Sequence, residues 1–162
     1  MLTEVCIMPH QQGIKTVAQN RKAYHDYFVE DKIECGISLF GTEVKSIRQG
    51  KVNLKESWAQ VRKGEIWVEG MHISPYEQGN IFNRDPLRAK KLLLHRREIY
   101  NLEAKVMRQG FTLVPLELYF KNGRVKMQLG LCKGKQLHDK RDSMARKDSE
   151  REIQRALREK QK

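Results

Sequence analysis

Two pairs of adjacent residues have the side chains that acid–base chemistry needs. His25-Asp26 and His138-Asp139 each place an imidazole beside a carboxylate. Catalysis of this kind requires both groups to be held in a fixed geometry. Adjacent side chains on a strand point to opposite faces, so His25 and Asp26 would not form a dyad unaided. His138 lies in a terminal segment that we expect to have no fixed geometry. We therefore expect polar surface residues at both pairs, and a hydrolase that uses either pair is the minor alternative.

The sequence has no pattern typical of a metal or nucleotide site. Its five His and three Cys residues are dispersed, without the spacing of zinc ligands. Gly-Lys occurs at positions 50–51 and 134–135, but without the strand and the Ser or Thr that a phosphate-binding P-loop requires. Cys6, Cys35 and Cys132 form no disulfide framework, which favours a reducing cytoplasm. We expect no metal, no cofactor and no enzymatic activity.

The charge of the chain points instead to binding of a polyanion. The 162 residues have a formal net charge of +12, and 32% of them are charged. This balance is typical of proteins that bind nucleic acid or an anionic membrane surface. No apolar run approaches the ~20 residues that cross a bilayer, and the N-terminus lacks the basic and apolar regions of a signal peptide. Nucleic acid is therefore the favoured partner.

The last thirty residues, 133–162, differ most from the rest of the chain. Eleven are Lys or Arg, six are Asp or Glu, and few are large and apolar. Such a segment buries too little surface to offset the entropy of ordering, so we expect a tail that is disordered when free and folds on RNA. An S-x-x-E capping box at Ser149 precedes good helix formers, but a lone helix of about 13 residues is marginal in water. The alternative is a solvated basic tail that adds nonspecific affinity.

The first residues of this tail have side chains suited to RNA. Residues 133–135 (Lys-Gly-Lys) form a flexible basic joint. The flat ring of His138 can stack on an unpaired base, and Lys140 and Arg141 can bind phosphates.

The rest of the chain predicts short strands with two helical insertions. Alternating apolar residues predict a strand over 33–40, and a short helix follows over 42–49 with Thr42 as its N-cap. The tight turns Lys63-Gly64 and Asn122-Gly123 predict hairpins of strands 57–62 with 65–73, and 116–120 with 125–131. Asp85-Pro86 predicts the start of a longer helix over 88–108, with a basic face opposite its apolar stripe.

These elements predict a mainly β fold that is closed on itself. An OB-like β-barrel with flanking helices fits the size and would leave no exposed sheet edge, although strand number alone does not separate it from an SH3-like barrel. We divide the chain into a loose N-terminal arm (1–19), a barrel domain (20–132) and the basic tail (133–162).

One residue of the predicted sheet is suited to reading bases. Glu34 lies on the outward face of its strand, beside Gly36 and Ser38. Small neighbours permit close approach, and a carboxylate accepts hydrogen bonds from base amino groups. An ordinary surface glutamate is the alternative, as a solvated face is for the basic helix.

Four strings in order along residues 14–162 resemble the SmpB family of SsrA-binding proteins. They are NRKAYHDY at 20–27, GTEVKSIR at 41–48, Asp85-Pro86 with KLLL at 91–94, and Gly134-Lys135 with HDKR at 138–141. Residues 1–13 match nothing in this family, and segment 76–84 is assigned no role.

The resemblance implies a monomeric cytoplasmic factor with an OB-like barrel. It implies that this factor binds the tRNA-like domain of transfer-messenger RNA (tmRNA, or SsrA) and, with elongation factor Tu on the charged tmRNA, delivers it to stalled ribosomes. The ribosome is then rescued, and the incomplete protein is tagged for degradation. A general basic RNA-binding or ribosome-associated protein with the same fold is the alternative, and an RNA-processing hydrolase is a weaker one.

The resemblance also implies roles for particular residues. It places at the tmRNA surface Asn20, Glu34, Lys45 and Leu93. It implies that the tail becomes helical in the empty mRNA channel and that His138 stacks on a base of small-subunit ribosomal RNA. The residues that it assigns to the decoding centre and the channel are Lys133, Gly134, Lys135, His138, Asp139, Lys140 and Arg141.

Overall fold

A computed structural model describes residues 13–160 of the chain. Nine strands and five helical segments follow one another along it. The strands are β1 (Lys15–Gln19), β2 (Tyr27–Ile37), β3 (Val52–Asn53), β4 (Trp58–Arg62), β5 (Glu65–Glu69), β6 (His72–Ile73), β7 (Lys90–Leu93), β8 (Thr112–Lys121) and β9 (Arg124–Gly134). The helices are α1 (Arg21–Asp26), α2 (Gly41–Arg48), the 3-10 turn η1 (Asn80–Phe82), α3 (Arg96–Gln109) and α4 (Leu137–Lys160).

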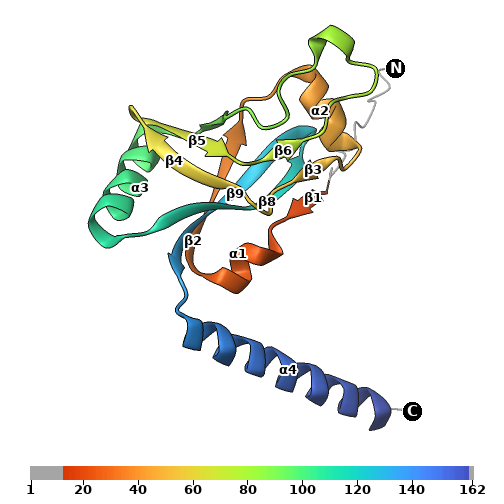
Figure 1. Ribbon diagram of the computed structural model, residues 1–162, viewed down its shortest axis with the longest axis vertical. Helices are drawn as coiled ribbons and strands as arrows, with labels where there is room; N and C mark the ends of the chain where they lie inside the picture. The colour runs from red at the N-terminus through yellow and green to blue at the C-terminus, as the bar shows by residue number, and fades with distance from the viewer. Residues whose placement is uncertain (1–12, 161–162) are drawn as a thin grey trace, which may run out of the picture.

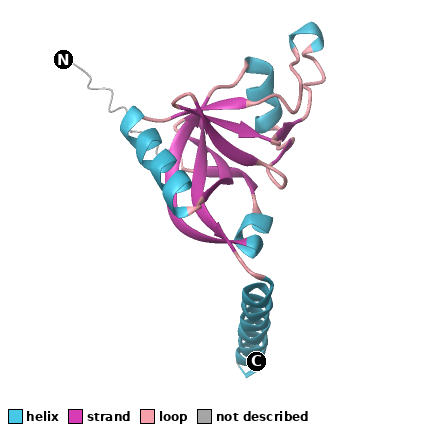
Figure 2. Cartoon of the chain, turned by 60° about the vertical axis from the view of Figure 1, so that its left-hand side comes forward, coloured by secondary structure: helices cyan, strands magenta, loops and turns pink. Residues whose placement is uncertain are grey.

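The main sheet closes on itself, and helices flank it. Its strands have the order β1-β8-β4-β5-β7-β2-β9, and β9 also pairs with β8, so every strand of this sheet except β1 belongs to one ring. Strands β3 and β6 form a separate two-stranded sheet. Figure 2 shows the strands curving around a common interior, with α3 along one side. The expectation of a mainly β fold with flanking helices is confirmed.

The two predicted hairpin turns explain why neighbouring strands pair. Lys63 and Gly64 have φ of 49° and 73°, and Asn122 and Gly123 have φ of 51° and 72°. Two successive residues with positive φ are the geometry of a two-residue hairpin loop that matches the twist of the strands. These turns join β4 to β5 and β8 to β9, as expected.

The interior of the ring is filled by alternate residues of the strands. Met127, Leu129 and Leu131 of β9 are buried, as their regular spacing predicts. Ile47 from α2 and Leu102 from α3 join the same cluster, so both helices pack on the ring. No helix among residues 13–160 is long and apolar enough to cross a membrane.

The predicted helix over 88–108 is wrong in its first part. Asp85-Pro86 leads into a turn, in which Arg88 N donates to Asp85 O at 3.2 Å, and not into a helix. Residues 90–93 form β7, which lies between β5 and β2 and completes the ring. The helix α3 begins only at Arg96, where His95 N donates to Glu98 Oε2. Pairing with two distant strands therefore overrides the local helical pattern.

Lys90 illustrates the difference, because it is fully buried rather than exposed on a helix face. Its ammonium donates hydrogen bonds to the carbonyl oxygens of Met71 (2.7 Å), Arg88 (3.0 Å) and Pro86 (3.1 Å). Burial lowers the pKa of Lys90 to about 8, so the side chain is still mostly protonated at pH 7 and can donate all three bonds. Lys90 therefore ties the loop before β7 to the connection between β5 and β6.

Two elements near the N-terminus were not expected from the sequence. Lys15–Gln19 form β1 and pair with β8, so the last five residues of the expected loose arm belong to the sheet. Residues 1–12 lie outside the described part of the chain. Arg21–Asp26 form α1, which places His25 and Asp26 on a helix instead of a strand.

Two helix starts also differ from expectation. The N-cap of α2 is Phe40, whose backbone N–H donates to Glu43 Oε2 at 2.8 Å, whereas Thr42 Oγ1 donates to Phe82 O. The tail helix α4 begins at Leu137, twelve residues before the expected cap at Ser149, whose hydroxyl donates to Ala145 O within the helix.

Within the expected tail, Lys133 and Gly134 belong to β9, and residues 137–160 form one helix of 24 residues that projects away from the ring (Figure 1). Its apolar side chains Leu137, Met144, Ile153 and Leu157 are all exposed. Disorder of this segment in the free protein stays a prediction.

Candidate nucleic-acid interface

Strands β2 and β7 bring together two of the residues expected to bind tmRNA. The strands are antiparallel, with Gly36 opposite Leu93, and Glu34 lies two residues before Gly36 on the same face. A Cβ on Gly36 would lie only 3.2 Å from the Cβ of Leu93, so glycine gives the Leu93 side chain its place across the strand. Leu93 is 54% exposed, and with Glu34 it lines a cleft of about 600 Å³.

Two side chains of β8 fix the carboxylate of Glu34. Tyr119 Oη donates to Glu34 Oε2 at 2.6 Å, and Lys121 Nζ donates to both carboxylate oxygens at 3.0 and 3.1 Å. The hydrogen bonds from Tyr119 and Lys121 lower the pKa of Glu34 below its usual value. Burial and the bond to Glu34 raise the pKa of Tyr119, so its hydroxyl stays a donor. Glu34 is therefore a positioned acceptor at neutral pH.

Basic side chains line the same cleft. Lys91, Arg96 and Lys126 contribute to its wall, and Lys126 lies opposite Gly36 on β9. Cations bind phosphates, an exposed leucine packs on bases or sugars, and a carboxylate accepts from base N–H groups. The cleft thus offers the three kinds of contact that an RNA surface can use. We call the set Glu34, Leu93, Lys91, Arg96 and Lys126 the β2–β7 cleft.

Asn20 does not belong to this cleft and is almost fully buried. It is only 3% exposed. Its Nδ2 donates to Leu54 O (3.0 Å) and Pro115 O (3.1 Å), and its Oδ1 accepts from Ala23 N as the N-cap of α1. Both amide donors are therefore used inside the protein. The structure gives Asn20 a positioning role, because it ties α1 to the ring.

Lys45 also lies apart from Glu34 and Leu93. It is exposed on α2, and its ammonium is 5.3 Å from the centre of the Tyr76 ring. Segment 76–84, for which the sequence suggested no role, thus supplies the aromatic partner of a predicted RNA-binding lysine.

The expected ribosome-binding residues lie where β9 ends and α4 begins. Lys133 and Gly134 are exposed at the end of β9, and His138 and Arg141 are exposed on the first turns of α4. Two others are held by the body: Lys135 Nζ donates to Tyr24 O (3.2 Å), and Lys140 Nζ pairs with Asp26 Oδ1 (3.4 Å). Asp139 Oδ2 accepts from Gln136 N and so stabilises the start of α4.

These contacts form a joint between α1 and α4, which consists of Tyr24, His25, Asp26, Lys135 and Lys140. The backbone N–H of Lys135 donates to Asp26 O at 2.9 Å, and His25 Nδ1 lies 2.8 Å from Asp26 Oδ1. The hydrogen bond from His25, followed by that from Lys140, lowers the pKa of Asp26. The expectation that His25 and Asp26 lie on opposite faces of a strand is wrong, because they end the helix α1 and their side chains meet there. Asp26 also contacts the start of the tail, through Lys135 N and Lys140 Nζ.

The thiols offer no reactive site in the described part of the chain. Cys35 and Cys132 are free and buried, and burial raises their pKa to about 12 and about 11. Thiols of this kind stay protonated and unreactive. Among residues 13–160, no group of three or more His, Cys, Asp or Glu side chains is arranged to hold a metal ion.

Comparison with known proteins settles the family. A model of the family described as SmpB protein matches residues 17–159. The chain belongs to the SmpB family. This SmpB-family chain is 64% identical over 145 residues to the SsrA-binding protein of Acetivibrio thermocellus, which is 90% of this chain and 94% of that one. It is 59% identical over 155 residues to the SsrA-binding protein of Geobacillus kaustophilus, which is 96% of this chain and 99% of that one.

A solved structure extends the likeness to three dimensions. It is described as "tmRNA-SmpB: a journey to the center of the bacterial ribosome". The two chains are 45% identical, with a TM-score of 0.63 over 78% of this chain and 93% of that one. The resemblance that the sequence motifs suggested is thereby confirmed.

Sequence reasoning missed the side chains that hold or surround Glu34. Tyr119 and Lys121 are 85 and 87 residues away along the chain. The regular alternation of β9 could have pointed to Lys126 and Gln128 on one face, since Gln128 pairs with Glu34. No local pattern could have placed Tyr119 beside Glu34, because the contact depends on how the ring closes.

Proposed function

We propose that this protein binds tmRNA and acts at the ribosome in trans-translation. The family and the relatives named as SsrA-binding proteins support this role, and so does the likeness to an SmpB structure described with tmRNA and the ribosome. The family is one of RNA-binding proteins and not of enzymes. We also infer that it works in the cytoplasm, where ribosomes are, and as a monomer. Elongation factor Tu on the charged tmRNA is its proposed companion.

We also propose how the fold is divided into functional parts. We interpret the closed ring as an OB-like barrel that binds RNA on one face, and residues 133–162 as a functional part of their own. The arm 1–19 is then reduced to its first residues, since β1 is part of the sheet.

The single observation that supports the RNA contact best is the positioned carboxylate of Glu34 beside exposed Leu93 and three cations. Glu34 accepts from bases of the tRNA-like domain, Leu93 packs on a base or sugar, and Lys91, Arg96 and Lys126 bind phosphates. Lys45 extends the basic surface, and Asn20 acts indirectly by holding α1 against the ring. The tail residues 133–141 bind ribosomal RNA at the decoding centre, and the rest of α4 enters the mRNA channel.

Two substitutions in the cleft test this proposal. Glu34→Gln removes the charge but keeps the shape, and Leu93→Ala removes the exposed apolar group. Each should weaken binding to the tRNA-like domain about tenfold, the size expected for a base contact worth ~1–3 kcal/mol. Binding is measured by filter retention at one fixed salt concentration, because phosphate contacts make affinity depend steeply on salt.

Two matched control substitutions distinguish an effect of the cleft from a general effect of the exposed surface. Glu30→Gln changes another exposed carboxylate on β2, and Leu87→Ala changes another half-exposed leucine, both outside the cleft. Neither should alter affinity. Equal losses in cleft and control variants would contradict the proposed surface. Equal displacement of tmRNA by ordinary tRNA or duplex DNA would favour a general basic RNA-binding protein instead.

A further inference from the structure

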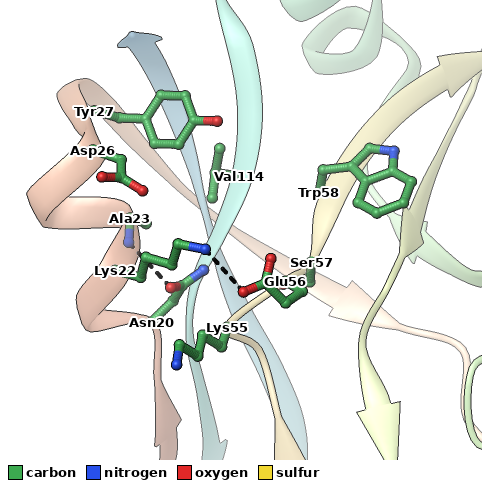
Figure 3. A pocket seen from close by; sticks show the side chains of 10 residues that line it. All are labelled: Asn20, Lys22, Ala23, Asp26, Tyr27, Lys55, Glu56, Ser57, Trp58 and Val114. Atoms are coloured by element: carbon green, nitrogen blue, oxygen red, sulfur yellow. Dashed lines mark hydrogen bonds and ion pairs between the residues drawn. The ribbon is translucent and has the colours of Figure 1, made fainter. Parts of the chain in front are cut away.

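A second cleft lies between α1 and the segment that leads into β4. Its volume is about 230 Å³, and none of its lining residues belongs to the β2–β7 cleft. Figure 3 shows the rings of Tyr27 and Trp58 on opposite sides of this hollow, with Val114 between them. The volume is below the roughly 300–1,000 Å³ of pockets that enclose drug-sized ligands, so the cleft suits one ring system.

Trp58 is built into this cleft as a supported, open platform. A Cβ on Gly70 would lie 2.9 Å from Cζ3 of the Trp58 ring and 2.3 Å from Glu56 O. Only glycine therefore allows the indole to rest against the backbone at this point, and the φ of Gly70, 70°, favours glycine as well. The ring is nevertheless 46% exposed. A large aromatic ring that is fixed on one side and open on another is the usual stacking surface for an unpaired base.

Charged groups of both signs surround the platform. Lys22 Nζ and Glu56 Oε1 form an ion pair of 2.9 Å at the cleft, and both side chains are well exposed. Such a pair contributes little to stability and can open at small cost. Lys55 lines the same cleft and has no ion pair within residues 13–160. An opened pair would leave two ammonium groups for a phosphate and one carboxylate for the N–H groups of a base.

We propose that this cleft binds one unpaired RNA base, stacked on Trp58, with its phosphate at Lys22 and Lys55. Glu56 accepts from the edge of the base, which favours guanine because its edge presents two adjacent N–H donors to a carboxylate. The base belongs to tmRNA or to ribosomal RNA, and this choice rests on the proposed function. The capacity of the cleft to bind a nucleotide does not rest on the proposed function.

The first test uses a nucleotide alone. Trp67→Phe leaves Trp58 as the single tryptophan of the full-length chain. Guanosine 5′-monophosphate should quench the fluorescence of Trp58 saturably, uridine 5′-monophosphate should do so more weakly, and inorganic phosphate should have no effect. Unchanged fluorescence, or equal quenching by phosphate, would overturn the proposal. If Trp67→Phe does not fold, the difference between the wild-type chain and Trp58→Tyr gives the same readout.

The second test identifies the RNA. Trp58→Leu should weaken binding about tenfold, the size that base–aromatic stacking supplies, and Trp58→Tyr should retain most of the affinity. Phe82→Leu is the matched control, because Phe82 is exposed and lies outside the cleft. A loss confined to the tRNA-like domain assigns the base to tmRNA, and a loss confined to ribosomes assigns it to ribosomal RNA.

Other outcomes reject the inference. If the Trp58→Leu variant binds the tRNA-like domain and the ribosome as tightly as the wild-type chain does, the cleft is not an RNA site. If Trp58→Leu weakens ribosome binding while the nucleotide leaves Trp58 fluorescence unchanged, the cleft receives a protein side chain and the proposal is wrong. A wild-type chain that failed to bind tmRNA at all would refute the proposed function, whereas the nucleotide titration would still decide about the cleft.

Discussion

In the ring, strands far apart in the sequence pair with one another, whereas in α4 each turn is held by residues within 24 consecutive positions. β2 pairs with β9 about one hundred residues later, and the inward-facing side chains of Cys35, Met127 and Leu129 in this pair are buried. The apolar side chains of α4 are exposed, and its contacts with the body are concentrated at the joint with α1. The body is thus held together by long-range pairing, whereas the tail is oriented by the contacts at its joint.

Removal of the tail should separate the functions of the two regions. Deletion of residues 136–162 should leave affinity for the tRNA-like domain nearly unchanged, because no residue of the β2–β7 cleft belongs to the tail. Tagging on stalled ribosomes should be abolished, since the decoding-centre contacts proposed for His138, Lys140 and Arg141 are lost. Binding and tagging are measured on the same preparation at fixed salt. A large loss of tmRNA affinity would show that the two regions do not act separately.

A pair of leucines tests where the stability resides. Leu129→Ala removes a fully buried side chain of β9 and should cost ~2–5 kcal/mol in the free energy of unfolding. Leu157→Ala, on the exposed surface of α4, should change it by no more than ~0.5 kcal/mol. Urea unfolding followed by tryptophan fluorescence measures both. Similar losses would mean that α4 packs on the ring in solution.

The pH dependence of Glu34 probes the body alone. The folded protein lowers the pKa of this carboxyl, so its contribution to stability is present above the ordinary pKa of ~4.3 and is lost as the pH falls through the lower, folded value. The side chain is partly exposed, so the effect should not exceed ~1 kcal/mol. Thermal melts of wild type and Glu34→Gln should differ at pH 7 and converge at acid pH. A constant difference would refute the assigned hydrogen bonds.

The smallest expected effect concerns the joint. Asp26→Asn weakens the pair with Lys140, which is partly exposed and contributes ~0.2–1 kcal/mol. The melting temperature should hardly change, but hydrogen exchange at the amides of residues 137–141 should become faster. Asp31→Asn, at another surface ion pair of the body, is the control. Unchanged exchange in Asp26→Asn would mean that the joint does not order the tail.

Local patterns predicted those parts of the molecule whose structure is decided locally. The two-residue turns with positive φ and the strict alternation of β9 dictated the hairpins, and Gly50, with φ of 74°, ends α2 where expected. Residues 90–93 were wrongly predicted to be helical, because a run of Lys and Leu is compatible with a helix. In the structure this run pairs with β2 and β5, and the pairing overrides the local preference. β1 has too few alternating residues to stand out without its partner β8.

Some features of the candidate site could likewise be predicted from the sequence, and others could not. Glu34 could be suggested from the strand pattern, and Leu93 only from the family resemblance; the structure places both in one cleft. The burial of Asn20 could not be foreseen, because its acceptors Leu54 and Pro115 come from distant segments. The pairing of His25 with Asp26 was missed because α1 is only six residues long and has no apolar period.

Because the ammonium of Lys90 is buried, covalent labelling of this residue can measure the opening of the ring. Its three carbonyl partners shield it from solvent, while the many other lysines of the chain include exposed ones on the strands, α2 and the tail. An amine-reactive mass tag should therefore modify those exposed lysines quickly and reach Lys90 only when the segment before β7 detaches. The extent of chemical modification at Lys90 would measure how often the ring opens and whether bound RNA keeps it closed.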